Sequence, residues 1–337
     1  MIILSSILIL LFIISLSKIY NHNGEGKFTL NPFNVVAIEP LKGLLALMVM
    51  FCHIAPNVDF GIFSEFGNYG PVAVGMFFFI SGYGLLKSLL SKDDYLQHFL
   101  SKRFSKLLPP ILIVTLCFVP LKMVWQGETF SEIVSTLANG STLTPFAWYV
   151  YVIILYYLIF YFLFKVIRRK LHALVVLILS IAAYVIIVKR VGWDACWYMS
   201  SHCFPLGLVC CYFEDSIKKM YMRKTILIIY AAAILILCYS GIGSYLGWPA
   251  WGSVIYYLIP FLVMPLMYTL SFGESPFLRF TGKISYEIYI LHGVFIYIGK
   301  DIFPHDITFV LFVILASYIA SYALHALCAS PFVKAKQ

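Results

Sequence analysis

Long apolar stretches follow one another along almost the whole chain, and they constrain the fold more than any other feature. Hydrophobic residues make up 62% of the sequence and charged residues only 12%, whereas a soluble domain carries about a quarter charged residues. We therefore predict an all-α, polytopic transmembrane bundle of about eleven helices. Stretches long enough to span a bilayer, about 17–25 residues, lie at 2–20, 35–56, 71–90, 107–124, 146–164, 171–188, 197–213, 225–241, 250–271, 284–300 and 307–328.

Lysine and arginine are distributed unevenly between the two sides of these predicted spans. If the N-terminus lies outside, only Lys122, Lys189, Arg190 and Lys300 face outward, and the other 20 of the 24 basic residues face inward. Because basic loops stay in the cytoplasm, we expect a multi-pass protein of the cell membrane with a cytoplasmic C-terminus. The net charge of +9 then reflects topology, and it does not indicate nucleic-acid binding.

The first apolar stretch differs from the others. Residues 2–20 contain no basic residue before Lys18 and no small-residue cleavage site, so we expect a retained helix, with a cleaved signal peptide as the alternative. The expected division is an extra N-terminal transmembrane helix with its inner loop at 1–34, and a membrane domain at 35–337. The eight cysteines form no CxxC pair and show no metal-ligand spacing, so we predict no metal site.

Ionisable residues inside a membrane span are costly, and they are candidates for function. The span at 35–56 carries Glu39 and Lys42 at its inner end and His53 in its outer half. Lys42 and His53 are eleven residues apart, which is about 16 Å along a helix axis and close to three turns, so both lie near one face. One helix thus offers a cation at the inner edge and an imidazole further out. The alternative is that His53 is a packed histidine and Lys42 an ordinary interfacial anchor.

Five motifs resemble the acyltransferase 3 family of membrane O-acyltransferases. Glu39-x-x-Lys42, then ten residues and His53, resembles the family's first core helix, Asp-Gly-Leu-Arg-Ala-Leu with an apolar run ending in His. Together the motifs cover roughly 35 to 300 in the right order, and the family's ten-helix core makes the span at 2–20 an addition. The other four segments are 75–83 (Phe-Phe-x-x-Ser-Gly-Phe in the family), 102–109 (Arg-x-x-Arg-x-x-Pro), Ala147-Trp148-Tyr149 (a Trp-aromatic pair) and 285–292 (Ser-Tyr-x-x-Tyr-x-x-His).

The chain departs from the family pattern at several positions. Lys42 and Lys106 stand where the family has arginine, which keeps the charge but loses the planar bidentate fork. Pro40 replaces a glycine, and no carboxylate follows Trp148 where many members carry a glutamate.

The resemblance implies transfer of an acyl group, most simply acetyl, from cytosolic acyl-CoA to a hydroxyl of a cell-surface polysaccharide or lipid-linked glycan. It makes His53 the general base, or the carrier of a transient acyl-imidazole. Lys42, Arg103 and Lys106 would grip the CoA phosphates, or else anchor to lipid headgroups. Acyl-CoA would be a donor substrate, with no permanently bound cofactor.

The resemblance also suggests roles for the remaining motif residues. Ser81 and Tyr83 would line the acyl tunnel, although Ser81-Gly82 equally suits close helix packing. Trp148 would stack on a sugar, or belong to an interfacial aromatic belt. His292 would orient other residues or bind acceptor, or be a satisfied structural histidine, and Glu39 would support the site by pairing with a cation.

Two other function classes fit a protein of this kind. A transporter or flippase would also need many spans with a few buried polar groups, but it would move solute without consuming acyl-CoA. A partner subunit with decayed motifs is the third reading, suggested by the arginine-to-lysine changes. The expected partners are acyl-CoA, a glycan acceptor and membrane lipid, and the sequence leaves the acceptor, the acyl chain length and the oligomeric state open.

Overall fold

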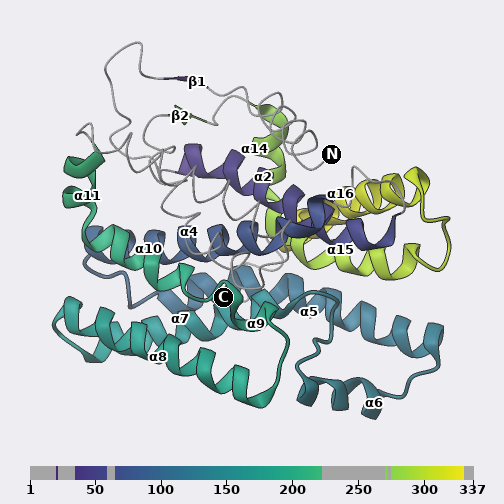
Figure 1. Ribbon diagram of the computed structural model, residues 1–337, viewed down its shortest axis with the longest axis horizontal. Helices are drawn as coiled ribbons and strands as arrows, with labels where there is room; N and C mark the ends of the chain where they lie inside the picture. Colours follow the sequence, from purple (N-terminus) through teal and green to yellow (C-terminus); the bar gives the residue numbers. More distant parts are fainter. Residues whose placement is uncertain (1–19, 22–34, 59–64, 222–269, 272–274, 330–337) are drawn as a thin grey trace, which may run out of the picture.

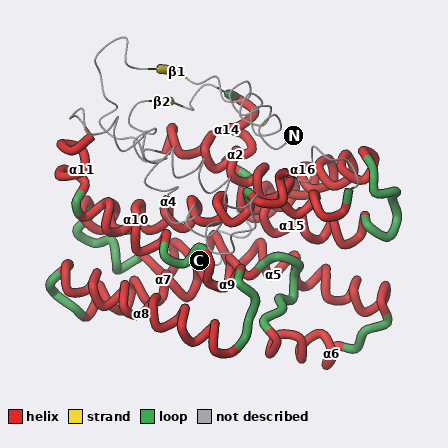
Figure 2. Tube along the Cα trace, in the orientation of Figure 1, coloured by secondary structure: helices red, strands yellow, loops and turns green. Residues whose placement is uncertain are grey.

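The computed structural model describes residues 20–21, 35–58, 65–221, 270–271 and 275–329. These residues are almost entirely helical (Figure 2). The one sheet among them is a two-residue antiparallel pair, β1 (Tyr20–Asn21) with β2 (Leu270–Ser271). The prediction of an all-α fold is therefore confirmed.

Six helices in the described part of the chain are long and apolar enough to cross a membrane. Each coincides with a predicted span, because an uninterrupted apolar run satisfies its own backbone hydrogen bonds as a helix. They are α2 (Val35–Ile54), α4 (Gly70–Ser91), α5 (Phe99–Gln126), α7 (Trp148–Val166), α8 (Lys170–Val191) and α16 (Ile307–Ala329).

Two other predicted spans take a different form. The stretch at 197–213 is broken into α9 (Cys196–Met199) and α10 (Cys203–Tyr212), because Pro205 has no amide hydrogen to continue a helix from α9. The stretch at 284–300 is α15 (Ser285–Gly299), preceded by the short α14 (Pro276–Lys283). Its 15 residues rise about 22 Å, less than a hydrocarbon core of about 30 Å.

The predicted spans at 2–20, 225–241 and 250–271 lie outside the described residues, apart from the few that form β1 and β2. The total of about eleven spans therefore stays a prediction, as does the separate domain at 1–34.

The long helices run beside one another and form layers (Figure 1). α2 packs against α4, α14 and α15, while α15 packs against both α2 and α16. α4 and α10 approach so closely that a side chain on Gly82 would overlap the Phe204 carbonyl, and one on Gly207 would overlap the Phe79 carbonyl. Small residues at such crossings let membrane helices pack backbone to backbone.

The outer faces of several helices are apolar. α8 exposes Leu179, Ile186 and Ile187, and α16 exposes Leu315 and Ile319. A soluble protein would rarely leave such continuous apolar faces in water, so these surfaces face lipid. With the six apolar helices, they identify a multi-pass membrane protein.

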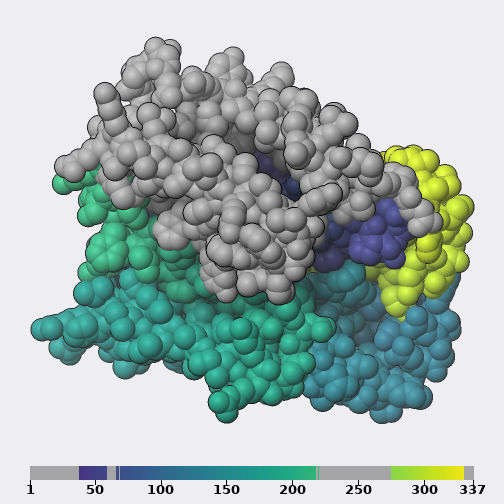
Figure 3. Space-filling view, in the orientation of Figure 1, coloured from purple at the N-terminus to yellow at the C-terminus, as the bar shows by residue number. Residues whose placement is uncertain are grey.

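The short helices mark the two ends of this bundle. α6 (Phe130–Ser135), in a predicted outer loop, and α11 (Glu214–Tyr221), in a predicted inner loop, lie at opposite ends in Figure 1. In the space-filling view, the green and teal surface of α8 to α11 adjoins the blue surface of α5 and α6 along the lower half of the molecule (Figure 3).

Candidate active site

Two histidines that are 239 residues apart in the chain meet inside the bundle. His53 comes from the last turn of α2, and His292 lies in the middle of α15. The Nδ1 atom of His53 lies 2.8 Å from the Nε2 atom of His292. His292 is fully buried. Two motif histidines from opposite ends of the sequence thus form one hydrogen-bonded pair.

The hydrogen bonds of this pair fix the position of each ring proton. The Nδ1 atom of His292 lies 3.0 Å from the carbonyl oxygen of Ile288, which can only accept, so this nitrogen is the donor. A neutral His292 ring then accepts at Nε2, and His53 must donate from Nδ1. No carboxylate in the described residues contacts either ring, and a buried unpaired imidazolium would be costly. The Nε2 atom of His53 is therefore left with a lone pair.

The loop before α7 covers the histidine pair. Phe146 stacks on His53 with ring centroids 4.0 Å apart and an interplanar angle of 7°. The backbone of Phe146 has φ 60°, a left-handed conformation that is uncommon for a bulky residue and is often found at functional sites. The Tyr289 hydroxyl donates a hydrogen bond to the backbone carbonyl of Phe146 at 2.6 Å. Gly293 has no side chain and so leaves space for Pro145 and the Phe146 ring. Tyr289 and Gly293 of α15 thus support this strained residue.

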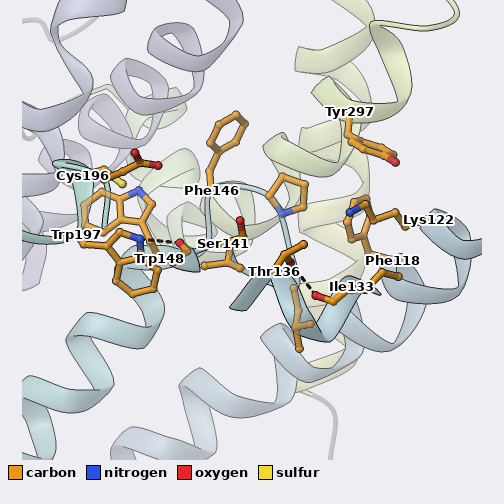
Figure 4. Close-up of a pocket in the computed structure, with 15 residues that line it drawn as sticks. Phe118, Lys122, Ile133, Thr136, Ser141, Phe146, Trp148, Cys196, Trp197 and Tyr297 are labelled. Carbon is orange, nitrogen blue, oxygen red and sulfur yellow. Dashed lines mark hydrogen bonds between the residues drawn. The ribbon is translucent and has the colours of Figure 1, made fainter. Parts of the chain in front are cut away.

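A cavity of about 340 Å³ opens on the other side of this loop. We name it the outer pocket, because its lining comes from segments at the predicted outer end of the bundle: α5, α6, the loop between α6 and α7, the first residue of α7, α9 and α15 (Figure 4). Trp148, Trp197 and Tyr297 contribute aromatic surface, and Phe146 also belongs to the lining. Of the sequence-predicted site residues, Trp148 lies here and not beside His53.

A second group of predicted residues gathers at the other end of α2. Arg103 and Lys106 both repel Lys42 electrostatically, and Glu39 attracts it. We call Lys42, Arg103 and Lys106 the inner cation cluster. It lies about three helical turns from His53 along α2. The backbone around Glu39 is fixed by contact with α14, where a side chain on Gly282 would overlap the Glu39 carbonyl.

Arg103 is held in position by aromatic side chains. Its guanidinium donates to the Tyr95 hydroxyl at 3.0 Å and lies over the Phe99 and Tyr157 rings, 6.0 and 5.6 Å from their centroids. The Tyr157 hydroxyl in turn lies 2.6 Å from the Ser81 Oγ atom. Ser81 is thus linked to the inner cation cluster through Tyr157.

The structure separates the predicted site residues into distinct places. Tyr83 is buried in the core between helices. Gly82, next to Ser81, has the packing role that was one of the two readings of this motif.

Sequence reasoning missed several residues of the site. Phe146 immediately precedes the Ala147-Trp148-Tyr149 motif, but nothing in the sequence indicates that this phenylalanine adopts a positive φ. Tyr289 belongs to the 285–292 motif, whose spacing places it one turn before His292. His325, which belongs to none of the five motifs, lies in α16 with its Nδ1 atom 2.9 Å from the buried carboxylate of Glu287.

Comparison with known proteins gives a family. The acyltransferase 3 family model, described as an acyltransferase domain, matches residues 35–326. Comparisons with curated proteins and with solved structures found no match. The match covers all five motifs and both histidines of the pair, and it leaves out the span at 2–20. The chain therefore belongs to the acyltransferase 3 family.

Proposed function

We propose that this protein is an O-acyltransferase that moves an acetyl group from acetyl-CoA on the cytosolic side to a hydroxyl of a cell-surface polysaccharide or lipid-linked glycan. The observation that carries the proposal is the His53–His292 pair, because it leaves an imidazole lone pair inside a membrane bundle. Family membership supports the reaction class. The donor, the acceptor and the direction across the membrane are our inference.

His53 Nε2 is suited to act as the general base. It removes the proton from the acceptor hydroxyl while the oxygen attacks the thioester carbonyl. The C–S bond then breaks, the leaving CoA sulfur takes the proton from His53, and an ester and free CoA result. His292 positions the base, since its Nε2 accepts from His53 Nδ1–H and so selects the tautomer with a lone pair at Nε2.

The inner cation cluster is suited to hold the donor. Lys42 is half-buried next to two other positive charges, an arrangement that needs a compensating anion. Glu39 supplies one negative charge, and the phosphates of CoA would supply the rest. With the phosphates at this end, the pantetheine arm would extend along α2 toward His53, about 16 Å away.

The orientation follows from the basic residues. We propose that the inner cation cluster faces the cytosol and the outer pocket faces outward, with the C-terminus cytoplasmic, because inward-facing loops hold most of the lysine and arginine. Acyl-CoA is a cytosolic metabolite, so this orientation brings the cations and the donor to one side.

The test compares cells that produce His53→Ala with cells that produce wild type or His172→Ala. His172 is an exposed histidine on α8, so its replacement is the matched control. We expect the acetyl ester content of purified cell-surface glycan to fall to background for His53→Ala and to stay unchanged for His172→Ala, at equal protein levels. Loss of a general base lowers rates by about 10²–10⁴-fold.

A second measurement separates the enzyme from a flippase. Purified wild-type protein in lipid nanodiscs should release free CoA from acetyl-CoA when envelope glycan extracted from the host is added. Acetylation that persists in His53→Ala cells would refute the catalytic assignment. Wild-type protein that moves lipid-linked glycan in vesicles without ever cleaving acetyl-CoA would replace the enzyme by a transporter.

A further inference from the structure

The outer pocket and Phe146 have a role that family membership does not assign. We propose that the outer pocket binds an uncharged sugar unit of the acceptor, and that the Phe146 ring closes the passage from this pocket to His53. This inference rests on the proposed acyl transfer and adds the acceptor's binding site, its chemical class and a gate. The cavity of about 340 Å³ falls within the usual range for small-molecule sites, about 300–1,000 Å³.

The lining suits a sugar ring. Trp148 and Trp197 offer aromatic faces to the apolar C–H face of a pyranose, while Ser141 and Asp194 offer hydrogen-bonding groups to its hydroxyls. The buried Tyr297 hydroxyl makes no hydrogen bond to any described residue, although Tyr297 lines the cavity. A buried hydroxyl without a partner is costly, and a rotation of the Tyr297 side chain toward the pocket would let a sugar hydroxyl satisfy it.

The charges around the pocket favour a neutral sugar. Lys122 lines the pocket, but its ammonium lies 2.8 Å from the Glu128 carboxylate. Asp194 adds a negative charge to the lining. The nearby cation is thus already compensated, and a uronic acid or phosphorylated sugar would meet the Asp194 carboxylate without a free cation to balance it.

The wall of the pocket is held in place before any ligand arrives. Trp197 Nε1 donates to the Gly140 carbonyl at 2.8 Å, and Trp193 Nε1 donates to the Ala138 carbonyl at 3.2 Å. Gly140 has φ 78°, and its Cα faces the Trp193 ring, so a side chain there would overlap the indole. A pocket that needs no ordering on binding loses less entropy than a flexible one.

Phe146 connects the outer pocket to the histidine pair. It belongs to the pocket lining, and its ring stacks on His53 at 4.0 Å. In Figure 4 this ring points away from Ser141 and Thr136. We place the ring between the pocket and His53, because Phe146 contacts both. Its rotation would open a path for the acceptor hydroxyl, and the closed position would keep water from the base.

The experiment uses full-length protein in nanodiscs with acetyl-CoA and defined acceptors. The neutral probes are the methyl β-glycosides of glucose, galactose and N-acetylglucosamine, and methyl β-glucuronide is the charged probe. We expect at least one neutral glycoside to be acetylated and to accelerate CoA release at least tenfold more than the glucuronide. An active glucuronide, or a panel without an active neutral glycoside, overturns the sugar assignment.

Three variants test the pocket and the gate. Ser141→Trp fills the pocket, and we expect it to lower the rate of acetyl transfer at least tenfold while the affinity for acetyl-CoA stays unchanged. Ser135→Trp, in nearby α6 but outside the pocket, is the matched control. Tyr297→Phe should raise the KM for the glycoside severalfold and leave the KM for acetyl-CoA unchanged. Phe146→Gly tolerates the positive φ and removes the ring, so CoA release without acceptor should rise at least fivefold as water reaches His53.

The outcomes separate this inference from the proposed function. Wild-type protein that neither binds nor cleaves acetyl-CoA refutes the proposed function itself. If the wild type acetylates a glycoside and both Ser141→Trp and Tyr297→Phe do so with wild-type kinetics, the function stands and the pocket assignment is wrong. Unchanged acceptor-independent CoA release by Phe146→Gly overturns the gate.

Discussion

Replacing His292 tests whether it selects the tautomer of the catalytic base. In His292→Leu the buried His53 Nδ1–H, which now donates to His292 Nε2 over 2.8 Å, loses its acceptor. A buried donor left without a partner costs about 1–3 kcal/mol. Each 1.36 kcal/mol corresponds to a factor of ten in rate, so we expect kcat to fall about 5- to 150-fold.

A conservative variant distinguishes positioning from general packing. The side-chain oxygen of His292→Gln can still accept from His53 Nδ1–H, whereas leucine cannot. We therefore expect His292→Gln to retain severalfold more activity than His292→Leu, with the KM for acetyl-CoA unchanged in both. The measurement is CoA release and acetyl ester formation by purified protein at saturating substrates, with thermal unfolding in detergent as the folding control.

Two results would refute the reasoning about His292. One is a kcat for His292→Leu within twofold of wild type, because it would mean that His53 needs no hydrogen-bond acceptor. The other is equal loss of activity in the glutamine and leucine variants at equal stability, because it would show that the imidazole acts by packing or by its own chemistry.

Two further changes test the donor site and the helix packing. Arg103→Ala should raise the KM for acetyl-CoA about 10- to 150-fold, the size expected for one charge-assisted contact. Alanine at the exposed neighbour Lys102 should leave this KM unchanged, and equal KM values for the two variants would contradict the donor assignment. Gly207→Ala should lower the unfolding temperature in detergent, because the added Cβ overlaps the Phe79 carbonyl and such overpacking costs about 1–3 kcal/mol. Gly84, with nothing within 4 Å of a built Cβ, is the control, and equal stability of the two alanine variants would contradict the close α4–α10 contact.

The hydropathy of the sequence correctly predicted the helices that run unbroken over a full span. In such a helix the backbone N–H and C=O groups form hydrogen bonds with one another. α8, for example, runs unbroken over Lys170–Val191, and its apolar residues extend around the helix with no interrupting proline. Hydropathy did not show that the stretch at 197–213 is divided into α9 and α10, with Pro205 in the first turn of α10, or that α15 in the stretch at 284–300 has only 15 residues. Hydropathy averages over a window, and so it does not register a break in backbone hydrogen bonding.

The two histidines and the basic residues of the candidate site could be named from the sequence, but their arrangement could not be predicted. The helical period correctly placed Lys42 and His53 on one helix, about three turns apart. The contact between His53 and His292 depends on how α2 and α15 cross, and no local pattern encodes a crossing. The motif order indicated the family, and that prediction is confirmed by the family match over 35–326.

The role of Phe146 shows where sequence reasoning stops. Its stacking on His53 depends on a positive φ, on the Tyr289 hydroxyl and on the space left by Gly293. These three contributions come from two distant parts of the chain, the loop before α7 and helix α15, and none of them indicates the stacking by itself. Only their combination in space brings an aromatic ring onto the histidine.

The most direct test of the whole account is an experimental structure of the protein in lipid with a non-transferable acetyl-CoA analogue. We predict density for the CoA phosphates against Lys42, Arg103 and Lys106. We also predict that the analogue's carbonyl carbon lies close enough to His53 Nε2 for one acceptor oxygen to fit between them, with that oxygen about 3–3.5 Å from the carbon. A structure in which His53 faces lipid, or in which CoA binds away from the inner cation cluster with its acyl end far from His53, would contradict the account.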